Sequence, residues 1–150
     1  MNPLDLKTAL LAKHAQHVVV IHFPIALFMA SVFFDLLARW RRDQALATVA
    51  YYNLLGAAVA TLPAVATGLL AWQWLLEGER LKGNLRLHLI MGLTSSSLIC
   101  LLLWWRTRMP KTAEESLTQA YIAVELIAVA VIALTGHLGG ILSGVEIPPG

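Results

Sequence analysis

The sequence predicts an all-α protein, a four-helix transmembrane bundle with up-down-up-down topology and a short interfacial segment at its N-terminus. Three observations indicate this class: the composition, four long apolar runs, and the short linkers between them. Of the 150 residues, 58% are hydrophobic and only 13% are charged, whereas soluble domains have about 45–50% apolar and about 25% charged residues. Because so few charges cannot cover a globular surface in water, we expect lipid to surround the chain.

The apolar runs give the predicted spans. They cover residues 18–40, 45–76, 85–105 and 117–142. A span needs about 20 mostly apolar residues, and backbone polar groups in hydrocarbon must be satisfied internally, which favours helices. The second run is long enough to tilt or to protrude from the bilayer.

The linkers predict how the spans are arranged. Residues 39–43, 77–84 and 106–116 separate the runs, and linkers this short make sequential helices antiparallel neighbours. Residues 1–16 carry spaced leucines and two lysines, a pattern that favours a helix in the interface plane. We therefore expect an interfacial segment over residues 1–16 and one transmembrane domain over residues 17–150.

Charge and cysteine content exclude several functions. The net charge is +2 and the basic residues lie in short clusters between apolar runs, which argues against a nucleic-acid partner. Cys100 is the only cysteine, so the chain has no intrachain disulfide and no CxxCH attachment site for a c-type haem. The sequence also has no Ser-His-Asp set and no phosphate loop. We expect a non-catalytic subunit rather than an enzyme.

Basic residues predict the orientation. Six of them fall at the face where the first helix ends, and five fall at the opposite face. The positive-inside rule counts such residues, and the cluster Arg39-Trp-Arg-Arg42 favours the first of these faces as the cytoplasmic one. Both termini would then lie outside.

Four histidines form the main candidate site. His17 and His22 lie at the start of the first predicted helix, His88 at the start of the third, and His137 near the end of the fourth. With alternating chain direction, three helices bring imidazoles to one face. Histidine is rare inside spans, and neutral imidazole binds transition metals and haem iron. The alternative is a set of hydrogen bonds between helices.

A b-type haem needs two axial imidazoles from facing helices. We expect His22 and His88 as the first choice of ligands, with His137 next and His17 after it. The competing hypothesis is a copper or zinc ion bound by His22, His88 and His137.

Small and aromatic residues at the same depth fit a macrocycle between helices. These residues are Gly68, Gly136, Gly139, Gly140, Trp72 and Trp74, and Arg86 is placed to reach a propionate. The glycines would equally serve close helix packing, and the tryptophans an interfacial belt.

Two acidic residues lie towards the other face. Asp35 precedes Arg39 by four residues, which predicts an ion pair within one helix. Glu125 has no such partner in its own helix and is a candidate for proton movement. Its alternative is a hydrogen bond to Tyr51, Tyr52 or Asn53.

Two motifs carry a family resemblance. The run His17-Val-Val-Val-Ile-His22-Phe-Pro-Ile-Ala26 and the closing Thr135-Gly-His137-Leu-Gly-Gly140 resemble the first-helix and last-helix patterns of the DUF2231 family of small bacterial four-helix membrane proteins. One departure is Val18, where the family commonly has proline.

The resemblance implies a multi-pass protein of the bacterial inner membrane, and the orientation expected from the basic residues then puts the histidine face in the periplasm. Some relatives are joined to, or encoded near, cytochrome-like modules, which implies redox work. The expected function is therefore a membrane-embedded electron-transfer subunit that binds a b-type haem, serves a larger redox complex or cytochrome partner, and exchanges electrons with quinone. The rival function is a structural or assembly subunit with no redox role.

Overall fold

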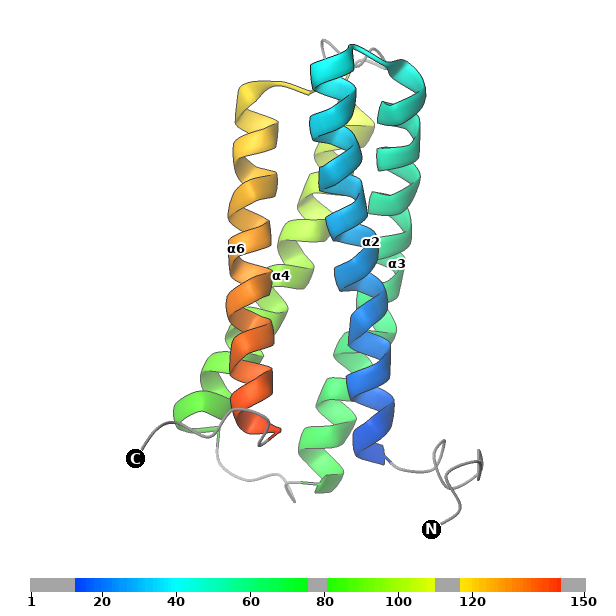
Figure 1. Cartoon of the computed structure of the whole chain (residues 1–150). Coiled ribbons are helices and arrows are strands. Elements are labelled where there is room, and N and C mark those ends of the chain that lie inside the picture. The colour runs from blue at the N-terminus through cyan, green and yellow to red at the C-terminus, as the bar shows by residue number, and fades with distance from the viewer. Residues whose placement is uncertain (1–12, 76–80, 110–116, 144–150) are drawn as a thin grey trace.

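The computed structural model describes residues 13–75, 81–109 and 117–143, with side chains described from residue 16 and up to residue 73 in the first of these segments. Four helices make up this part of the chain: α2 (Lys13–Arg41), α3 (Gln44–Leu75), α4 (Gly83–Arg108) and α6 (Gln119–Leu142) (Figure 1). All four are long and apolar enough to cross a membrane. The predicted all-α four-helix transmembrane bundle is confirmed.

The helix ends follow local chemistry. Arg42 adopts a left-handed φ of 53° and reverses the chain, and the Asp43 carboxylate then accepts a hydrogen bond from the Ala45 amide at 2.8 Å. At α6, the Thr118 hydroxyl accepts from the Tyr121 amide at 3.2 Å, as helix N-caps commonly do. Helix α2 begins at Lys13, so residues 13–16 continue into the first span, and the rest of the predicted interfacial segment lies outside the described residues.

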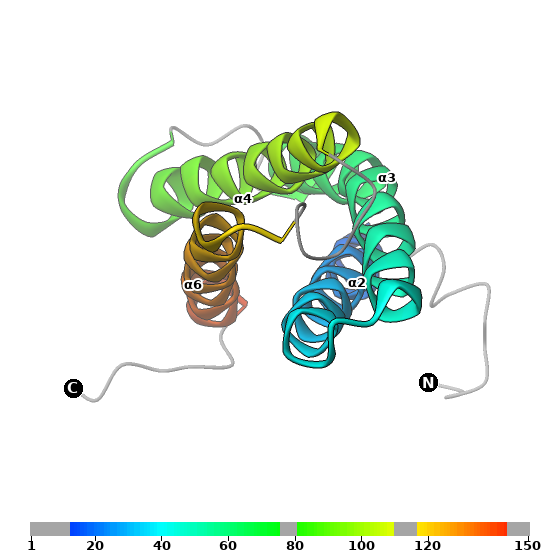
Figure 2. The same ribbon diagram turned by 90° about the horizontal axis from the view of Figure 1, so that it is seen from above.

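The helices run up, down, up and down, and they form two pairs (Figures 1 and 2). α2 packs most extensively on α3, and α4 packs on α6. α4 is inclined across the bundle, so that its end lies near the start of α3, whereas its beginning lies beside the end of α6 (Figure 1). The contact between α2 and α6 is small.

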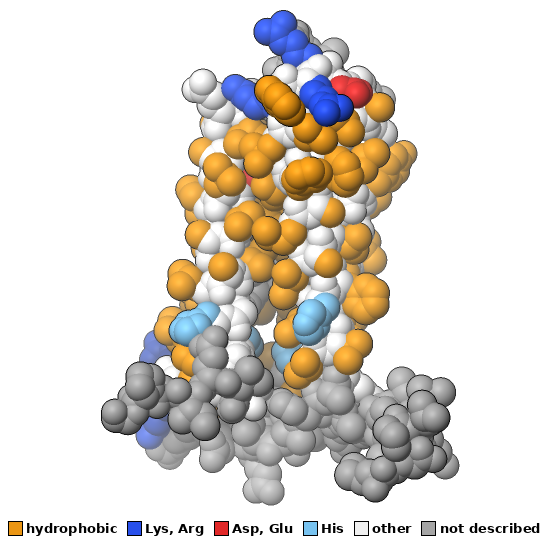
Figure 3. All heavy atoms as spheres, in the orientation of Figure 1, with side chains coloured by type: hydrophobic (Ala, Val, Ile, Leu, Met, Phe, Trp, Pro, Cys, Tyr) orange, Lys and Arg blue, Asp and Glu red, His pale blue; other side chains and the backbone are white. Residues whose placement is uncertain are grey.

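The two ends of the bundle differ in their side chains. We call the end with Arg39, Arg41, Arg42, Arg106 and Arg108 the arginine end, and the end with His17, His22, His88 and His137 the histidine end (Figure 3). The buried apolar core, which includes Phe28, Leu54, Leu102 and Tyr121, lies in the half nearer the arginine end.

Burial stops about halfway along the helices. Residues 16–23, 62–73, 83–94 and 133–143 make up the histidine half, and none of these described positions is buried. Figure 3 shows histidine side chains on both sides of an opening between the two columns of helices at this end. The arginine half therefore contains the core that holds the bundle together, and the described residues of the histidine half are packed loosely.

Candidate functional site

His17 is anchored between α2 and α3. Its side chain is half-buried, and its Nδ1 lies 3.1 Å from the Thr67 hydroxyl oxygen. The Thr67 hydroxyl donates to the carbonyls of Pro63 and Ala64, at 2.8 and 3.1 Å. Since a hydroxyl has one proton, Thr67 accepts from His17, which places the imidazole proton on Nδ1 and the lone pair on Nε2.

His88 is anchored in the same way between α4 and α6. Its side chain is half-buried, and its Nδ1 donates to the Thr135 carbonyl at 3.1 Å. A carbonyl can only accept, so this imidazole also carries its proton on Nδ1. The Thr135 hydroxyl lies 3.1 Å from that of Ser95, which ties α4 to α6 one turn further along.

Two glycines make room for these rings. A Cβ atom on Gly68 would lie 3.0 Å from His17 Cε1, and one on Gly139 would lie 3.2 Å from His88 Cε1. Each imidazole thus rests against glycine backbone of the paired helix. Gly68 was expected beside a macrocycle, and the structure places it beside an imidazole.

His22 and His137 lie on the outside of the bundle. His22 is exposed, and its Nδ1 donates to the Val18 carbonyl of its own helix at 2.6 Å. It lines a shallow recess on α2 with Phe23 and Ala26. His137 is also exposed. The structure therefore separates the four histidines into an anchored pair, His17 and His88, and an exposed pair.

The other expected residues are spread around this end. A Cβ atom on Gly136 would meet open space, Gly140 and Trp72 are half-buried, and Arg86 is exposed in the first turn of α4. The side chain of Trp74 lies outside the described residues. Within the described segments, no three His, Cys, Asp or Glu side chains come together as a group that could hold a metal ion.

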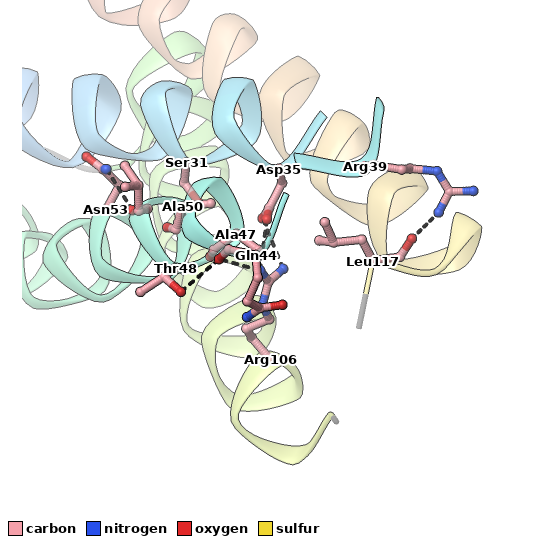
Figure 4. Close-up of polar contacts among 11 residues, drawn as sticks. Ser31, Asp35, Arg39, Gln44, Ala47, Thr48, Ala50, Asn53, Arg106 and Leu117 are labelled. Atoms are coloured by element: carbon pink, nitrogen blue, oxygen red, sulfur yellow. Dashed lines mark hydrogen bonds and ion pairs between the residues drawn. The ribbon is translucent and has the colours of Figure 1, made fainter. Parts of the chain in front are cut away.

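The arginine end contains a buried ion pair that links α2 and α4 (Figure 4). Arg106 donates from Nη1 to Asp35 Oδ2 at 3.1 Å and from Nη2 to Asp35 Oδ1 at 2.9 Å. Nη2 also donates to the Ala47 carbonyl of α3 at 3.2 Å. The predicted pair between Asp35 and Arg39 is not formed, because Arg39 instead donates to the Leu117 carbonyl at the start of the fourth span.

Glu125 brings a second carboxylate to this cluster. It is fully buried, and its side chain faces Asp35, Arg106 and Tyr121. Neither of its oxygens, nor the Tyr121 hydroxyl, meets hydrogen-bond geometry with a described residue. The alternative hydrogen bond to Tyr51, Tyr52 or Asn53 is therefore not formed among the described residues. Tyr52 is exposed, and the Asn53 amide donates to the Val49 carbonyl.

Sequence reasoning missed Arg106 as part of this site. It was assigned to the linker after the third span, yet α4 extends to Arg108 and carries Arg106 inside the bundle. The available signal was the number of acids: two lie in the apolar runs on this side, and Arg39 could balance only one of them.

Four spanning helices with an apolar outer surface define a multi-pass integral membrane protein. The chain matches the family model described as predicted membrane protein (DUF2231) over residues 13–145, and it belongs to this family. Comparison with curated proteins and with solved structures gave no match.

Proposed function

We propose that this protein is a membrane-embedded electron-transfer subunit that binds one b-type haem at the histidine end. The observation that supports this proposal is the contrast between the two halves of the bundle. The arginine half has a buried core, whereas the histidine half has four imidazoles and no buried residue among its described positions. Enclosing a large apolar ring would bury apolar helix surface there, and histidines supply the axial donors that such a ring needs.

His17 and His88 are the axial ligands in this proposal, in place of the pair His22 and His88 expected from sequence. Ligating imidazoles normally donate their second ring nitrogen to an oxygen, which fixes the tautomer and orients the ring. Both anchored histidines already have this arrangement, with Nδ1 held by Thr67 and by Thr135. His22 also donates its Nδ1 to a carbonyl, that of Val18 in its own helix, but its ring is exposed on the outside of the bundle.

The surrounding residues have defined roles in this arrangement. The open side of Gly136 would leave room beside α6, with Gly140 and Trp72 at the same end. Arg86, which is exposed in the first turn of α4, would pair with a propionate. A bound haem would supply one-electron oxidation and reduction. The chain itself would orient the imidazoles and exclude water.

The partners follow from the size of the chain and from its charges. Four helices with no recognisable catalytic set among their described residues suit a subunit of a larger redox complex, which would pass electrons to a cytochrome partner or to quinone. The arginine cluster favours a cytoplasmic arginine end, and in the bacterial inner membrane the histidine end would then face the periplasm.

The test is a visible spectrum of the full chain, expressed with a haem precursor and purified in detergent, before and after dithionite reduction. We expect a reduced α-band typical of bis-imidazole ligation, which His17→Ala and His88→Ala each abolish. His22→Ala is the matched control, because this exposed ring lies on the same helix, and it should keep the band.

The same experiment decides between the alternatives. The hydrogen bonds of His17 and His88 join paired helices, which also favours a structural or assembly role with no cofactor. A folded, colourless, metal-free protein would support that role and refute the haem. Stoichiometric copper or zinc, lost in the variants, would instead support a metal-ion site.

A further inference from the structure

The second site in this bundle is the buried charge cluster at the arginine end, and it is independent of the proposed haem. All four helices contribute to it: Asp35 from α2, the Ala47 carbonyl from α3, Arg106 from α4, and Tyr121 with Glu125 from α6. Asp35 is 1% exposed and Glu125 is 0% exposed. Side chains of the protein core therefore surround both carboxylates and separate them from solvent and lipid headgroups.

The charges in this cluster do not balance if both acids are ionised. Arg106 uses one edge of its guanidinium for both oxygens of Asp35, and Nη2 also donates to the Ala47 carbonyl. Its carbon lies 5.4 Å from the centre of the Tyr121 ring, so the ring covers a further side. The other arginines of this end, Arg39, Arg41, Arg42 and Arg108, are exposed.

An ionised Glu125 would be a second negative charge beside Asp35 in an apolar, fully buried position. A buried charge without a paired counter-charge is very unfavourable, and in membrane interiors such groups bind protons or partners. A carboxylic acid that carries a proton is neutral, and it can donate to the Asp35 carboxylate next to it. One proton thus removes the excess negative charge and gives one of the two unpartnered Glu125 oxygens a hydrogen to donate.

We propose that Glu125 and Asp35 form a proton-binding site, in which the two carboxyl groups hold one proton while Arg106 balances the remaining negative charge. Uptake converts one carboxylate and one proton into one carboxylic acid, with no electron transfer. Asp35 lies six residues before the end of α2 and Glu125 lies six residues after the start of α6. At a rise of about 1.5 Å per residue, this is about 9 Å from the arginine end, which is the face that would exchange the proton.

The test is infrared spectroscopy of the full chain in detergent at neutral pH, in H2O and in D2O. We expect a C=O stretching band of one protonated carboxylic acid, shifted to lower frequency by D2O and lost in Glu125→Gln. Asp43→Asn is the matched control, because this carboxylate is a helix cap at the turn between α2 and α3, and it should leave the band intact.

Labelling keeps the test decisive if Glu125→Gln does not fold. Wild-type protein grown with carboxyl-¹³C glutamate must show the same band at lower frequency. Absence of a protonated-acid band from the wild type at neutral pH overturns the proposal. So does a band that survives Glu125→Gln, or one that does not shift with labelled glutamate. The result does not depend on haem, so failure of the redox proposal leaves it standing.

Discussion

Removing the Asp35 carboxylate tests whether the ion pair with Arg106 stabilises the bundle. In Asp35→Asn, the amide keeps one acceptor oxygen, but the guanidinium of Arg106, whose side chain is 7% exposed, loses its counter-charge. If only two ordinary hydrogen bonds were weakened, at about 0.6 kcal/mol each inside a membrane protein, the loss would be about 1 kcal/mol. Leaving one partner of a buried ion pair uncompensated costs about 3–5 kcal/mol. Because Arg106 is so deeply buried, we expect the free energy of unfolding to fall by about 3 kcal/mol.

The assay is reversible unfolding in mixed micelles, followed by helix content as the fraction of denaturing detergent rises. Arg108→Gln is the matched control on the same helix, since Arg108 is exposed and lies over the Trp104 ring at 5.4 Å. It should cost at most about 1 kcal/mol. A loss of about 1 kcal/mol or less in Asp35→Asn, and also in the double variant with Glu125→Gln, would refute the reasoning, because the pair would then be no more than two weak hydrogen bonds.

Glu125 links this prediction to the proton site. In Asp35→Asn, Glu125 can release its proton and become the counter-charge of Arg106. This replacement limits the fall in the free energy of unfolding. In the double variant Asp35→Asn with Glu125→Gln, no acid remains to balance the arginine. We expect Glu125→Gln alone to change stability by less than about 1 kcal/mol, and the double variant to lose about 2 kcal/mol more than Asp35→Asn, a coupling within the range seen for contacting residues. If the stability losses of the two single variants simply add up to that of the double variant, Glu125 does not compensate for the loss of Asp35.

Three further substitutions test local packing and backbone. Gly139→Ala places a Cβ atom 3.2 Å from His88 Cε1 and should displace the ring, lowering the melting temperature in detergent and any haem occupancy. Gly136→Ala has open space and should be neutral or stabilising by up to about 1 kcal/mol, as alanine favours helix; equal effects of both would contradict the packing described. Arg42→Gly should raise the free energy of unfolding by up to about 1 kcal/mol, because only glycine adopts a φ of 53° without strain. A lower melting temperature would show that the Arg42 side chain stabilises the protein by more than its left-handed backbone destabilises it.

The spans and their topology could be predicted because they depend on length and composition alone. Each run was long enough to cross a bilayer, and the linkers were too short for any arrangement but antiparallel neighbours. The same chain direction brings the four histidines to one end. The observed helix bounds, such as Gln119–Leu142 for the fourth span, differ from the apolar runs by a few residues, because caps such as Thr118 and terminal arginines extend or shorten a helix.

The rotation of each helix about its axis could not be predicted. These helices are apolar on nearly every side, since lipid and neighbouring helices are both apolar, so hydrophobic periodicity does not say which face points inward. His17 and His22 are about 140° apart on α2, and only the packing of α2 on α3 selects His17 for the inward position. The pairing of Asp35 with Arg106 spans 71 residues and depends on the inclination of α4, which no local pattern encodes.

The two sites divide the bundle into a rigid half and an open half. Asp35, Arg106 and Ala47 tie α2, α3 and α4 together at the arginine end, and Arg39 attaches the start of α6 through Leu117. At the histidine end, by contrast, the hydrogen bonds of His17 and His88 join helices of the same pair, His17 to α3 and His88 to α6. A bundle fastened at one end can separate its two pairs at the other without losing its core. The packing of the arginine half therefore determines how far apart the two helix pairs lie at the histidine end. Such an end can accept a bound group between the pairs without a change in the core.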